Sequence, residues 1–266
     1  MHQKLEQLQR LVSETGSLLV AFSGGVDSAF LLAVARNVLG ERAAAITVDT
    51  PFHSRCEIDG ADRLAAALGV RHLKIKIPWD ALPELVNNPP ERCYICKKAV
   101  FKRCLKVCSD QGFSVLADGS NLDDLDDYRP GWAALRELGV RSPLLESGLT
   151  KQEIRQLSRE MGLETWDKPA LACLMTRLPH GETVTVEHLR RIEVCEDFLR
   201  TSGFGQLRVR SHDDTARIEV EQGQIEQLCT PEMRERISTR FRSAGFSRVT
   251  VDLGGYRCGS MNPGSP

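Results

Sequence analysis

Residues 23–28, which read Ser-Gly-Gly-Val-Asp-Ser, have the clearest chemical potential in the chain. An apolar run at 18–22 precedes them and a helix-like run at 29–39 follows, so we expect a tight turn between a buried strand and a helix. Two glycines let the backbone approach an anion, and the free N–H groups at the helix start attract it. Asp27 would repel a bare phosphate, but it suits a site in which a divalent cation bridges it to phosphates. The turn therefore predicts a site for nucleotide phosphates and Mg²⁺.

The same six residues do not fit two other nucleotide loops. The lysine-containing phosphate loop requires a Gly-Lys-Ser/Thr that is missing here, and the glycine spacing differs from the dinucleotide fingerprint. A plain strand-to-helix turn with capping serines would not need two glycines and an aspartate as well. The pattern Ser-Gly-Gly-x-Asp-Ser resembles the pyrophosphate loop of the N-type ATP pyrophosphatases. That resemblance implies cleavage of ATP between its α and β phosphates, adenylation of a substrate oxygen and release of pyrophosphate.

Nine cysteines, an odd number, exclude complete disulfide pairing. Cys93 and Cys96 form a Cys-x-x-Cys pair, a pattern used for redox exchange, zinc or iron–sulfur clusters. Structural zinc needs four ligands, and neither a second such pair nor paired histidines occur in the sequence. Cys173, near Thr176 and Arg177, is a third candidate. Three thiolates suit a [4Fe–4S] cluster with one open iron. Alternatively, Cys173 acts alone as a nucleophilic thiolate, and the positive charge of Arg177 lowers the pKa of its thiol. For the other six cysteines we expect the role of small buried hydrophobes, an alternative that is also open for these three.

Length and charge limit the classes of function. A chain of 266 residues is long enough for two domains. Lysine plus arginine is 35 and aspartate plus glutamate is 36, a net charge of −1, so no overall basic character indicates a nucleic-acid partner. No run is apolar enough to span a bilayer, and the N-terminus lacks a signal-peptide pattern. We therefore expect a cytoplasmic enzyme with a small-molecule substrate.

Strand-like and helix-like segments alternate through the first two thirds of the chain. This alternation predicts an α/β fold with a doubly wound parallel sheet, in which ligands lie at the carboxyl ends of the strands. Thr47, Gly119 and Asn121 end or follow such strands and are expected near the nucleotide. The acidic residues at 123–127 either belong to that site or form an ordinary solvated loop. Strands are expected at 18–22, 43–48, 72–77 and 114–117, an edge element at 141–144, and helices at 2–15, 29–39, 54–68, 98–111, 132–138 and 150–161.

The pattern of expected helices and strands changes after residue 175. A helix at 186–202, strands at 206–211 and 215–221, a helix at 230–244 and a strand at 246–252 predict a smaller α+β domain. We therefore divide the chain into an ATP pyrophosphatase domain, 1–175, and a substrate and assembly domain, 176–266. Arg208 and Arg210 alternate along a strand and so share a face. Side by side they make a forked anion receptor, although the spacing fits ordinary surface charge equally well.

Nearly the whole chain resembles the LarE family of ATP-dependent sulfur transferases, which build the nickel-pincer cofactor of lactate racemase. The resemblance implies that ATP adenylates a carboxylate of a pyridinium dicarboxylate mononucleotide, and that sulfur then displaces AMP to give a thiocarboxylate. One variant of the family sacrifices a single cysteine, at the position of Cys173, which becomes dehydroalanine. The other holds a [4Fe–4S] cluster on three cysteines and passes on a cluster-bound sulfide, and Cys93, Cys96 and Cys173 resemble that second variant. The resembling segments are 23–28, 92–98, 119–121, 127–131, 142–146, 166–177, 208–210, 216–220 and 255–262.

The resemblance also implies roles for single residues. Arg208 and Arg210 would bind the substrate phosphate, with Thr176 and Arg177 beside it. Asp27 would hold Mg²⁺ and act in catalysis with the three cysteines, and the protein would assemble as a trimer or hexamer. The implied ATP-binding residues are Ser23, Gly24, Gly25, Asp27, Ser28, Thr47, Gly119, Asn121 and Arg129.

Three other functions share part of this pattern. A tRNA-thiolating ATP pyrophosphatase has the same loop and often cysteines, but it needs a basic surface for phosphates. An amide-forming enzyme such as an NAD or GMP synthetase would not need Cys93, Cys96 and Cys173. A non-catalytic sensor of ATP or of a cluster would not need the complete loop at 23–28, and a pyrophosphate-release assay distinguishes it from an enzyme.

Overall fold

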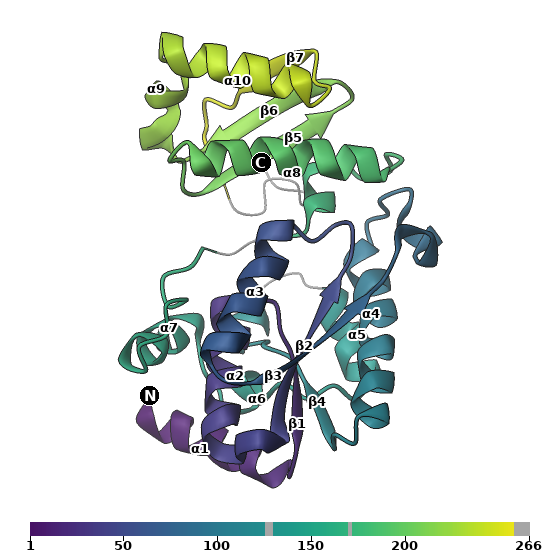
Figure 1. The fold of residues 1–266 in the computed structure, drawn as a ribbon, viewed down its shortest axis with the longest axis vertical. Helices are drawn as coiled ribbons and strands as arrows, with labels where there is room; N and C mark the ends of the chain where they lie inside the picture. Colours follow the sequence, from purple (N-terminus) through teal and green to yellow (C-terminus); the bar gives the residue numbers. More distant parts are fainter. Residues whose placement is uncertain (126–129, 170–171, 258–266) are drawn as a thin grey trace. The chain divides into compact units, whose positions relative to one another are not determined.

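A parallel sheet of four strands, in the order β3-β2-β1-β4, forms the centre of the first part of the chain. Its strands are β1 (Leu18–Ala21), β2 (Ala43–Asp49), β3 (Arg71–Lys76) and β4 (Val115–Ala117). Helices α1 (His2–Glu14), α2 (Val26–Leu39) and α3 (Arg55–Ala67) lie on one side of the sheet, and α4 (Arg92–Asp110) and α5 (Pro130–Glu137) on the other (Figure 1). The predicted doubly wound parallel sheet is confirmed.

The structure is a computed structural model that describes residues 1–125, 130–169 and 172–257. They divide into two compact units. Unit 1 comprises Met1–Pro83 and Glu91–Leu171, and unit 2 comprises Glu84–Pro90 and Ala172–Pro266. Within the described residues, no helix is long and apolar enough to cross a membrane.

The strand order of unit 1 places a topological switch point between β1 and β4. The chain runs from β1 outward to β2 and β3, and α4 then returns it to β4 on the other side of β1. Ligands of open α/β sheets bind at the carboxyl ends of the strands at such a point. Residues 23–28 directly follow β1 and therefore lie there. Helix α2 continues from them, and its residues 29–35 are all buried, which explains their unbroken apolar run.

Unit 1 is completed by two short elements and one regular helix. Arg141 forms a single parallel bridge to Ala117, and the chain then turns into α6 (Pro143–Glu146). The expected edge element at 141–144 is thus one bridge followed by a helical turn, because Pro143 has no N–H to donate to a sheet. Helix α7 (Lys151–Glu160) begins with a capping box of Thr150 and Glu153. The 3₁₀ turns of the chain are η1 (Gly40–Arg42), η2 (Trp79–Ala81), η3 (Pro83–Leu85), η4 (Leu122–Leu125), η5 (Leu174–Arg177) and η6 (Gln222–Gln224).

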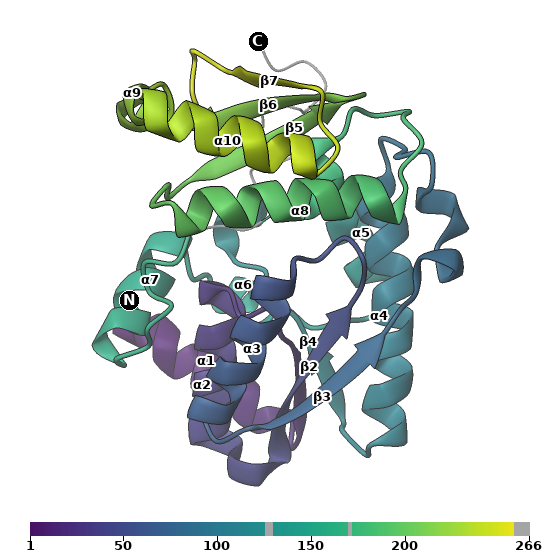
Figure 2. The same cartoon turned by 45° about the horizontal axis from the view of Figure 1, so that its top comes forward.

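Unit 2 contains a three-stranded sheet in the order β5-β6-β7 (Figure 2). Strands β5 (Leu207–His212) and β6 (Thr215–Val220) form an antiparallel hairpin, and β7 (Arg248–Val251) pairs parallel to β6. Helix α8 (Val186–Thr201) packs on β5, and α10 (Pro231–Ser243), which follows the short α9 (Ile225–Leu228), packs on α8 and β7. This arrangement confirms the predicted small α+β region.

The segment 84–90 joins unit 2 through its backbone and one buried amide. Asn88 has a φ of +43° and is fully buried, and its side-chain amide donates to the carbonyls of Leu178 (3.0 Å) and Pro179 (2.7 Å). The N–H of Val184 donates to the carbonyl of Val86 at 2.7 Å. The chain therefore enters unit 2 once before α4 and again after residue 171.

Candidate active site

The glycines of the pyrophosphate loop are required by local geometry. Gly24 has a φ of +68°, and a Cβ on it would lie 3.1 Å from the Cα of Ala61 in α3. Gly25 is the N-cap of α2. The hydroxyls of Ser23 and Ser28 lie 3.2 Å apart, and Ser28 donates to the Gly25 carbonyl at 3.2 Å. A larger residue at position 24 would be strained and crowded, so the loop depends on its glycine.

The segment after β4 lies against the start of α2, as predicted. A Cβ on Gly119 would lie 3.0 Å from the backbone nitrogen of Ser28. The Asn121 amide donates to Oδ1 of Asp27 at 3.3 Å. On the other side, the Thr47 hydroxyl donates to the carbonyl of Phe22, directly before the loop, at 2.6 Å. The structure therefore brings Thr47, Gly119 and Asn121 to the loop.

A cavity of about 350 Å³ opens beside these residues in unit 1. One part of its wall is polar and includes the loop, and the other part is apolar, a combination that suits the phosphates and the base of a nucleotide. Of the predicted residues, Ser23, Asp27, Ser28, Thr47, Gly119 and Cys96 line it. Asp124, one of the acidic residues for which both a site role and a solvated loop were open, lines it as well, as does Val48 beside Thr47. Lining residues that were not predicted include His53, Glu57, Lys97 and Asp118, with Ile46, Ile58, Val100 and Phe101 among the apolar ones.

Two lysines that sequence reasoning missed contact the loop. Lys151, the first residue of α7, forms an ion pair with Asp27. Lys168 donates from Nζ to the Gly24 carbonyl at 2.8 Å. The sequence predicted a helix at 150–161, but no local pattern could show that Lys151 reaches a loop more than a hundred residues earlier. Both ammonium groups lie where the negative charge of a triphosphate would be neutralised.

The turn that carries Lys168 is fixed from α7. Arg155 donates to the carbonyls of Trp166 (2.7 Å) and Lys168 (2.9 Å). The guanidinium of Arg159 lies over the ring of Trp166, 5.0 Å from its centroid. Two arginines of α7 therefore fix the backbone of the turn, and the Lys168 side chain extends from it to the loop.

Asp27 fits a site for one magnesium ion. It is a single carboxylate at the start of α2, it lines the cavity, and Lys151 and Asn121 orient it. Mg²⁺ bound to nucleotides takes one or two protein carboxylates and completes its shell with phosphate oxygens and water. The described residues contain no group of three or more His, Cys, Asp or Glu side chains that could hold a metal without such help.

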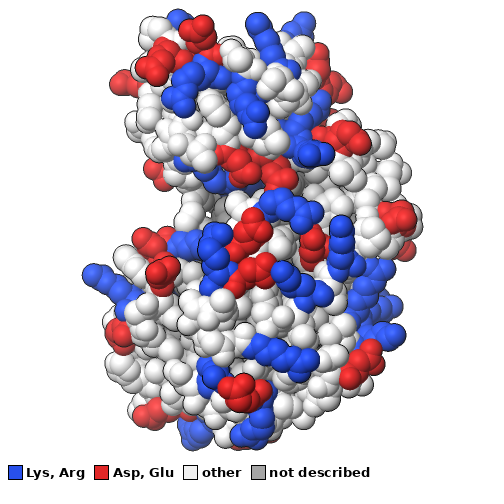
Figure 3. All heavy atoms as spheres, in the orientation of Figure 1, with Lys and Arg blue, Asp and Glu red and all other residues white. Residues whose placement is uncertain are grey.

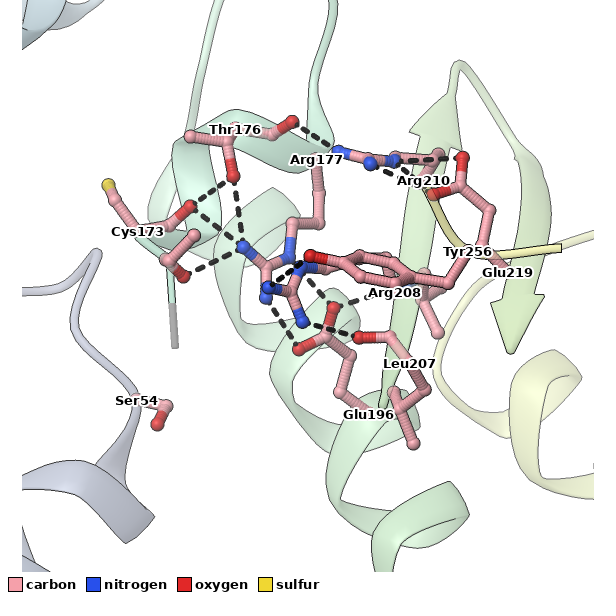
Figure 4. Close-up of polar contacts among 12 residues, drawn as sticks. Ser54, Cys173, Thr176, Arg177, Glu196, Leu207, Arg208, Arg210, Glu219 and Tyr256 are labelled. Carbon is pink, nitrogen blue, oxygen red and sulfur yellow. Dashed lines mark hydrogen bonds and ion pairs between the residues drawn. The ribbon is translucent and has the colours of Figure 1, made fainter. Parts of the chain in front are cut away.

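In unit 2, a buried ion pair holds the segment that carries Cys173 (Figure 4). Arg177 and Glu196 are 1% and 0% exposed, with contacts of 2.8 and 3.0 Å from Nε and Nη2. Nη1 of Arg177 donates to the carbonyls of Ala172 (2.7 Å) and Cys173 (3.1 Å) and to the Thr176 hydroxyl (2.9 Å). Burial by itself would raise the pKa of Glu196, but the charge and hydrogen bonds of Arg177 hold it below its ordinary value. Arg177 is thus directed at Glu196 and the main chain around Cys173.

Arg208 and Arg210 share one face of the sheet, and both are buried, at 5% and 4% exposure. They are therefore not ordinary surface charges. Arg210 forms a forked pair with Glu219, with contacts of 3.0 Å from Nε and 2.8 Å from Nη2, and donates to the Thr176 carbonyl at 2.9 Å. Arg208 lies over the Tyr256 ring, 4.9 Å from its centroid, as Figure 4 shows.

The buried cluster of unit 2 brings several charged groups together. Among the described residues it contains three arginines (Arg177, Arg208 and Arg210) and two carboxylates (Glu196 and Glu219), all less than 6% exposed. Burial, followed by the nearby charge of Arg177, lowers the pKa of Arg208.

The three candidate cysteines belong to different units. Cys93 and Cys96 lie three residues apart in the first turn of α4 in unit 1, so they share one helix face. Cys173 is the N-cap of η5 in unit 2. Arg129 and Cys258 lie outside the described residues.

Three further cysteines are buried. Burial raises the pKa of the Cys104 and Cys195 thiols to about 12 and also raises that of Cys108. Such thiols stay protonated and unreactive at neutral pH. For these three, the predicted role of small buried hydrophobes is confirmed. For Cys56 and Cys229 it is wrong, because both are exposed.

Comparison with known proteins identifies the family. The pyridinium-3,5-bisthiocarboxylic acid mononucleotide synthase of Lactiplantibacillus plantarum is 35% identical over 259 residues, which cover 97% of this chain and 91% of that protein. The chain belongs to the LarE family. Another relative, an uncharacterized protein of Synechocystis, is 41% identical over 98% of both chains. The asparagine synthase family model matches residues 6–97 of the chain. A glutamine-hydrolyzing GMP synthase of Chlamydia caviae is 32% identical over an alignment that covers 60% of this chain and 34% of that synthase.

Proposed function

We propose that this protein is an ATP-dependent sulfur transferase that converts a carboxylate of a pyridinium dicarboxylate mononucleotide into a thiocarboxylate, in the synthesis of a nickel-pincer nucleotide. The observation that carries the proposal is the geometry around the loop. In a chain of the LarE family, a glycine-dependent loop with Asp27, Lys151 and Lys168 borders a nucleotide-sized cavity at the switch point of the sheet.

In the first step, a substrate carboxylate oxygen attacks the α-phosphorus of ATP. The bond between the α-phosphorus and the bridging oxygen breaks, and pyrophosphate leaves. The backbone N–H groups at the start of α2 and the ammonium groups of Lys151 and Lys168 stabilise the charge that develops on pyrophosphate. Mg²⁺, held by Asp27, would neutralise further phosphate charge. No general base is needed, because a carboxylate is already a nucleophile.

In the second step, sulfur attacks the activated carbonyl carbon and AMP leaves. Along one route the thiolate of Cys173 attacks and forms a thioester. A base then removes the Cα proton of Cys173 as the Cβ–S bond breaks, which leaves the thiocarboxylate on the substrate and dehydroalanine in the chain. Arg177 supports this role because it fixes the carbonyls on either side of the Cα of Cys173. This route permits one turnover per chain.

Along the other route, Cys93, Cys96 and Cys173 would hold a [4Fe–4S] cluster, which would supply sulfide as the attacking group. The placement of Cys93 and Cys96 on one helix face supports a shared ligand pair. The third thiolate, that of Cys173, belongs to unit 2.

We further propose that the buried cluster of unit 2 binds the substrate phosphate through Arg208 and Arg210, with Thr176 and Arg177 alongside. Two buried guanidinium groups on one face of the sheet support an anion as ligand. A small substrate is also supported by the formal net charge of −1. On the face drawn in Figure 3, basic and acidic side chains are interspersed. A cytoplasmic location and a homo-oligomer, trimeric or hexameric, complete the proposal.

The test separates the two steps. Asp27→Asn should abolish substrate-dependent pyrophosphate release, whereas Glu41→Gln, which removes an exposed carboxylate beyond the far end of α2, should not. Cys173→Ala should release pyrophosphate but form no thiocarboxylate, and Cys229→Ala, an exposed cysteine of the same unit, should form it normally. Pyrophosphate release by Asp27→Asn, or thiocarboxylate formation by Cys173→Ala, would contradict the assigned roles.

Anaerobic purification distinguishes the two sulfur routes. About four irons per chain, with a broad absorption band, would support the cluster. Iron-free protein whose Cys173 loses the mass of hydrogen sulfide after one turnover would support the sacrificial route instead.

A further inference from the structure

The turn after β2 carries a histidine beside the apolar part of the nucleotide cavity. Thr50 and Pro51 begin this turn, and the N–H of His53 closes it by donating to the Thr50 carbonyl at 3.2 Å. The ring of Phe52, a buried residue, meets the His53 ring edge-on, with centroids 5.1 Å apart. The turn and this contact fix where the His53 ring lies. The side chain lines the cavity, together with Val48 of β2.

The carbonyl of Val48 sets the orientation of the ring. Along β2, the Ile46 carbonyl accepts the N–H of Phe22 on the side of β1. Carbonyls alternate in direction along a strand, so that of Val48, two residues further on, points to the same side. Strand β1 has already ended there and offers no partner. Nδ1 of His53 lies 3.0 Å from the Val48 carbonyl and takes the place of the missing strand.

This contact decides which nitrogen of the ring carries the proton. A carbonyl oxygen can only accept, so the contact with Val48 requires the proton on Nδ1. The Thr50 hydroxyl, 3.1 Å from Nδ1, rotates to suit the ring and imposes no tautomer. Nε2 of the neutral ring is then an acceptor, and no hydrogen bond from the described residues reaches it. The polar edge that the ring leaves to the cavity is therefore an acceptor.

The chemistry of the cavity wall indicates which part of ATP would meet Nε2. The phosphates belong at the loop beside Asp27, and the base belongs at the apolar wall, which includes Val48 and Ile58. Adenine carries an amino group at position 6, and an N–H that is buried without an acceptor costs free energy. Guanine and hypoxanthine carry a carbonyl oxygen at the same position, which would face a second acceptor.

We propose that His53 selects adenine over the other purines, with Nε2 accepting a hydrogen bond from the 6-amino group of ATP. The inference rests on the proposed function in one respect, that the cavity binds ATP. The apolar wall would take the faces of any purine, so it stabilises the base without selecting among purines. The ring supplies the selection, because the turn and the Val48 carbonyl hold Nε2 in place before ATP binds.

Three nucleotides measure this contact directly. ATP has the amino group, the triphosphate of purine riboside has only hydrogen at position 6, and ITP has an oxygen there. Calorimetry of the wild type at pH 8 with Mg²⁺ should give a Kd about threefold to tenfold higher for purine riboside triphosphate than for ATP, the effect of one hydrogen bond. The Kd for ITP should be higher by about tenfold or more, because an acceptor then faces an acceptor.

The decisive variant is His53→Asn. The asparagine amide can take the position of Nδ1 and donate to the Val48 carbonyl, but it has no group at the position of Nε2. The preference for ATP over the other two nucleotides should therefore fall to about twofold or less. A histidine that only fixed the backbone would keep its preference in this variant. His2→Asn, a change of an exposed histidine in α1, should bind all three nucleotides as the wild type does.

Two further measurements isolate the acceptor. His53→Gln places an amide near the position of Nε2, and the oxygen of that amide should restore part of the preference that His53→Asn loses. In ¹⁵N-labelled wild-type protein at pH 8, the His53 ring should carry a proton on Nδ1 and none on Nε2.

The results distinguish a failure of this inference from a failure of the proposed function. A wild type that binds ATP and ITP equally, a folded His53→Asn that keeps the preference, or a proton on Nε2 at pH 8 would overturn the role of His53. Each of these results would leave the proposed function standing. A wild-type protein that binds no MgATP would overturn the proposed function, and this inference with it.

Discussion

The buried Arg177–Glu196 pair allows the sharpest test of how unit 2 is held together. Glu196→Gln keeps the shape of the side chain but removes its charge. In the wild type this carboxylate accepts from Arg177, from Arg200 at 2.7 Å and from the Val209 N–H at 3.1 Å, and it has no exposed surface. The change leaves the guanidinium of Arg177, 1% exposed, without a counter-ion. Breaking a buried pair from one side costs about 3–5 kcal/mol.

The matched control is Arg200→Gln. Arg200 contacts the same carboxylate, but its side chain is 24% exposed, and a pair of that kind contributes about 1 kcal/mol or less. Hydrogen exchange followed by mass spectrometry measures the opening free energy of peptides from α8 and β5 directly, so that unit 1 does not dominate the result. We expect a fall of about 3–5 kcal/mol for Glu196→Gln and about 1 kcal/mol for Arg200→Gln.

The pH dependence gives a second check with a definite sign. The pKa of Glu196 is lowered in the folded protein, so its contribution is present above the pKa of the unfolded chain and is lost as the pH falls through the folded pKa. The difference between wild type and Glu196→Gln should therefore shrink in acid. Because Arg177 holds the carbonyls of Ala172 and Cys173, the variant should also lose sulfur transfer more than pyrophosphate release. A loss below about 1 kcal/mol, or one independent of pH, would refute this reasoning.

Three further predictions concern the pyrophosphate loop. Gly24→Ala should weaken MgATP binding at least tenfold, because its Cβ would lie 3.1 Å from the backbone of α3. The control, Gly16→Ala, has nearly the same positive φ but open space around it, so it should only cost about 1 kcal/mol of stability. Equal Kd values of the two variants in calorimetry would contradict this reasoning. Gly119→Ala should raise the Kd because it pushes against the first turn of α2, and Gly205→Ala, which meets no atom within 4 Å, should not. Lys168→Met removes about one charged hydrogen bond to the loop, so it should raise the KM for ATP about threefold to tenfold in a pyrophosphate-release assay. An unchanged KM would exclude a role of Lys168 in binding ATP.

The sequence alone predicted the pyrophosphate loop and the two folding patterns. The loop could be predicted because its glycines, serines and aspartate are adjacent in the chain, and each residue type meets a local need of the turn after β1. The strands and helices could be predicted because buried residues recur about every two positions on one face of a strand and about every four positions on one face of a helix. Thr47, Gly119 and Asn121 could be placed near the loop because parallel strands end at one edge.

Contacts that depend on tertiary packing could not be predicted in this way. Nothing in the local sequence shows that Lys151 and Lys168 reach the loop, or that residues 84–90 belong to unit 2. The alternation of Arg208 and Arg210 predicted a shared face, but only the packing of η5 and Tyr256 over that face shows that both are buried.

The same limit applies to the chemistry of the site. Sequence provides the groups and their local spacing, because covalent neighbours share a turn, a strand or a helix face. Their protonation and their partners depend on which distant segments pack around them, as α8 does around Arg177. For this protein, the type of loop followed from the order of residues, and the partners that tune it followed from the fold.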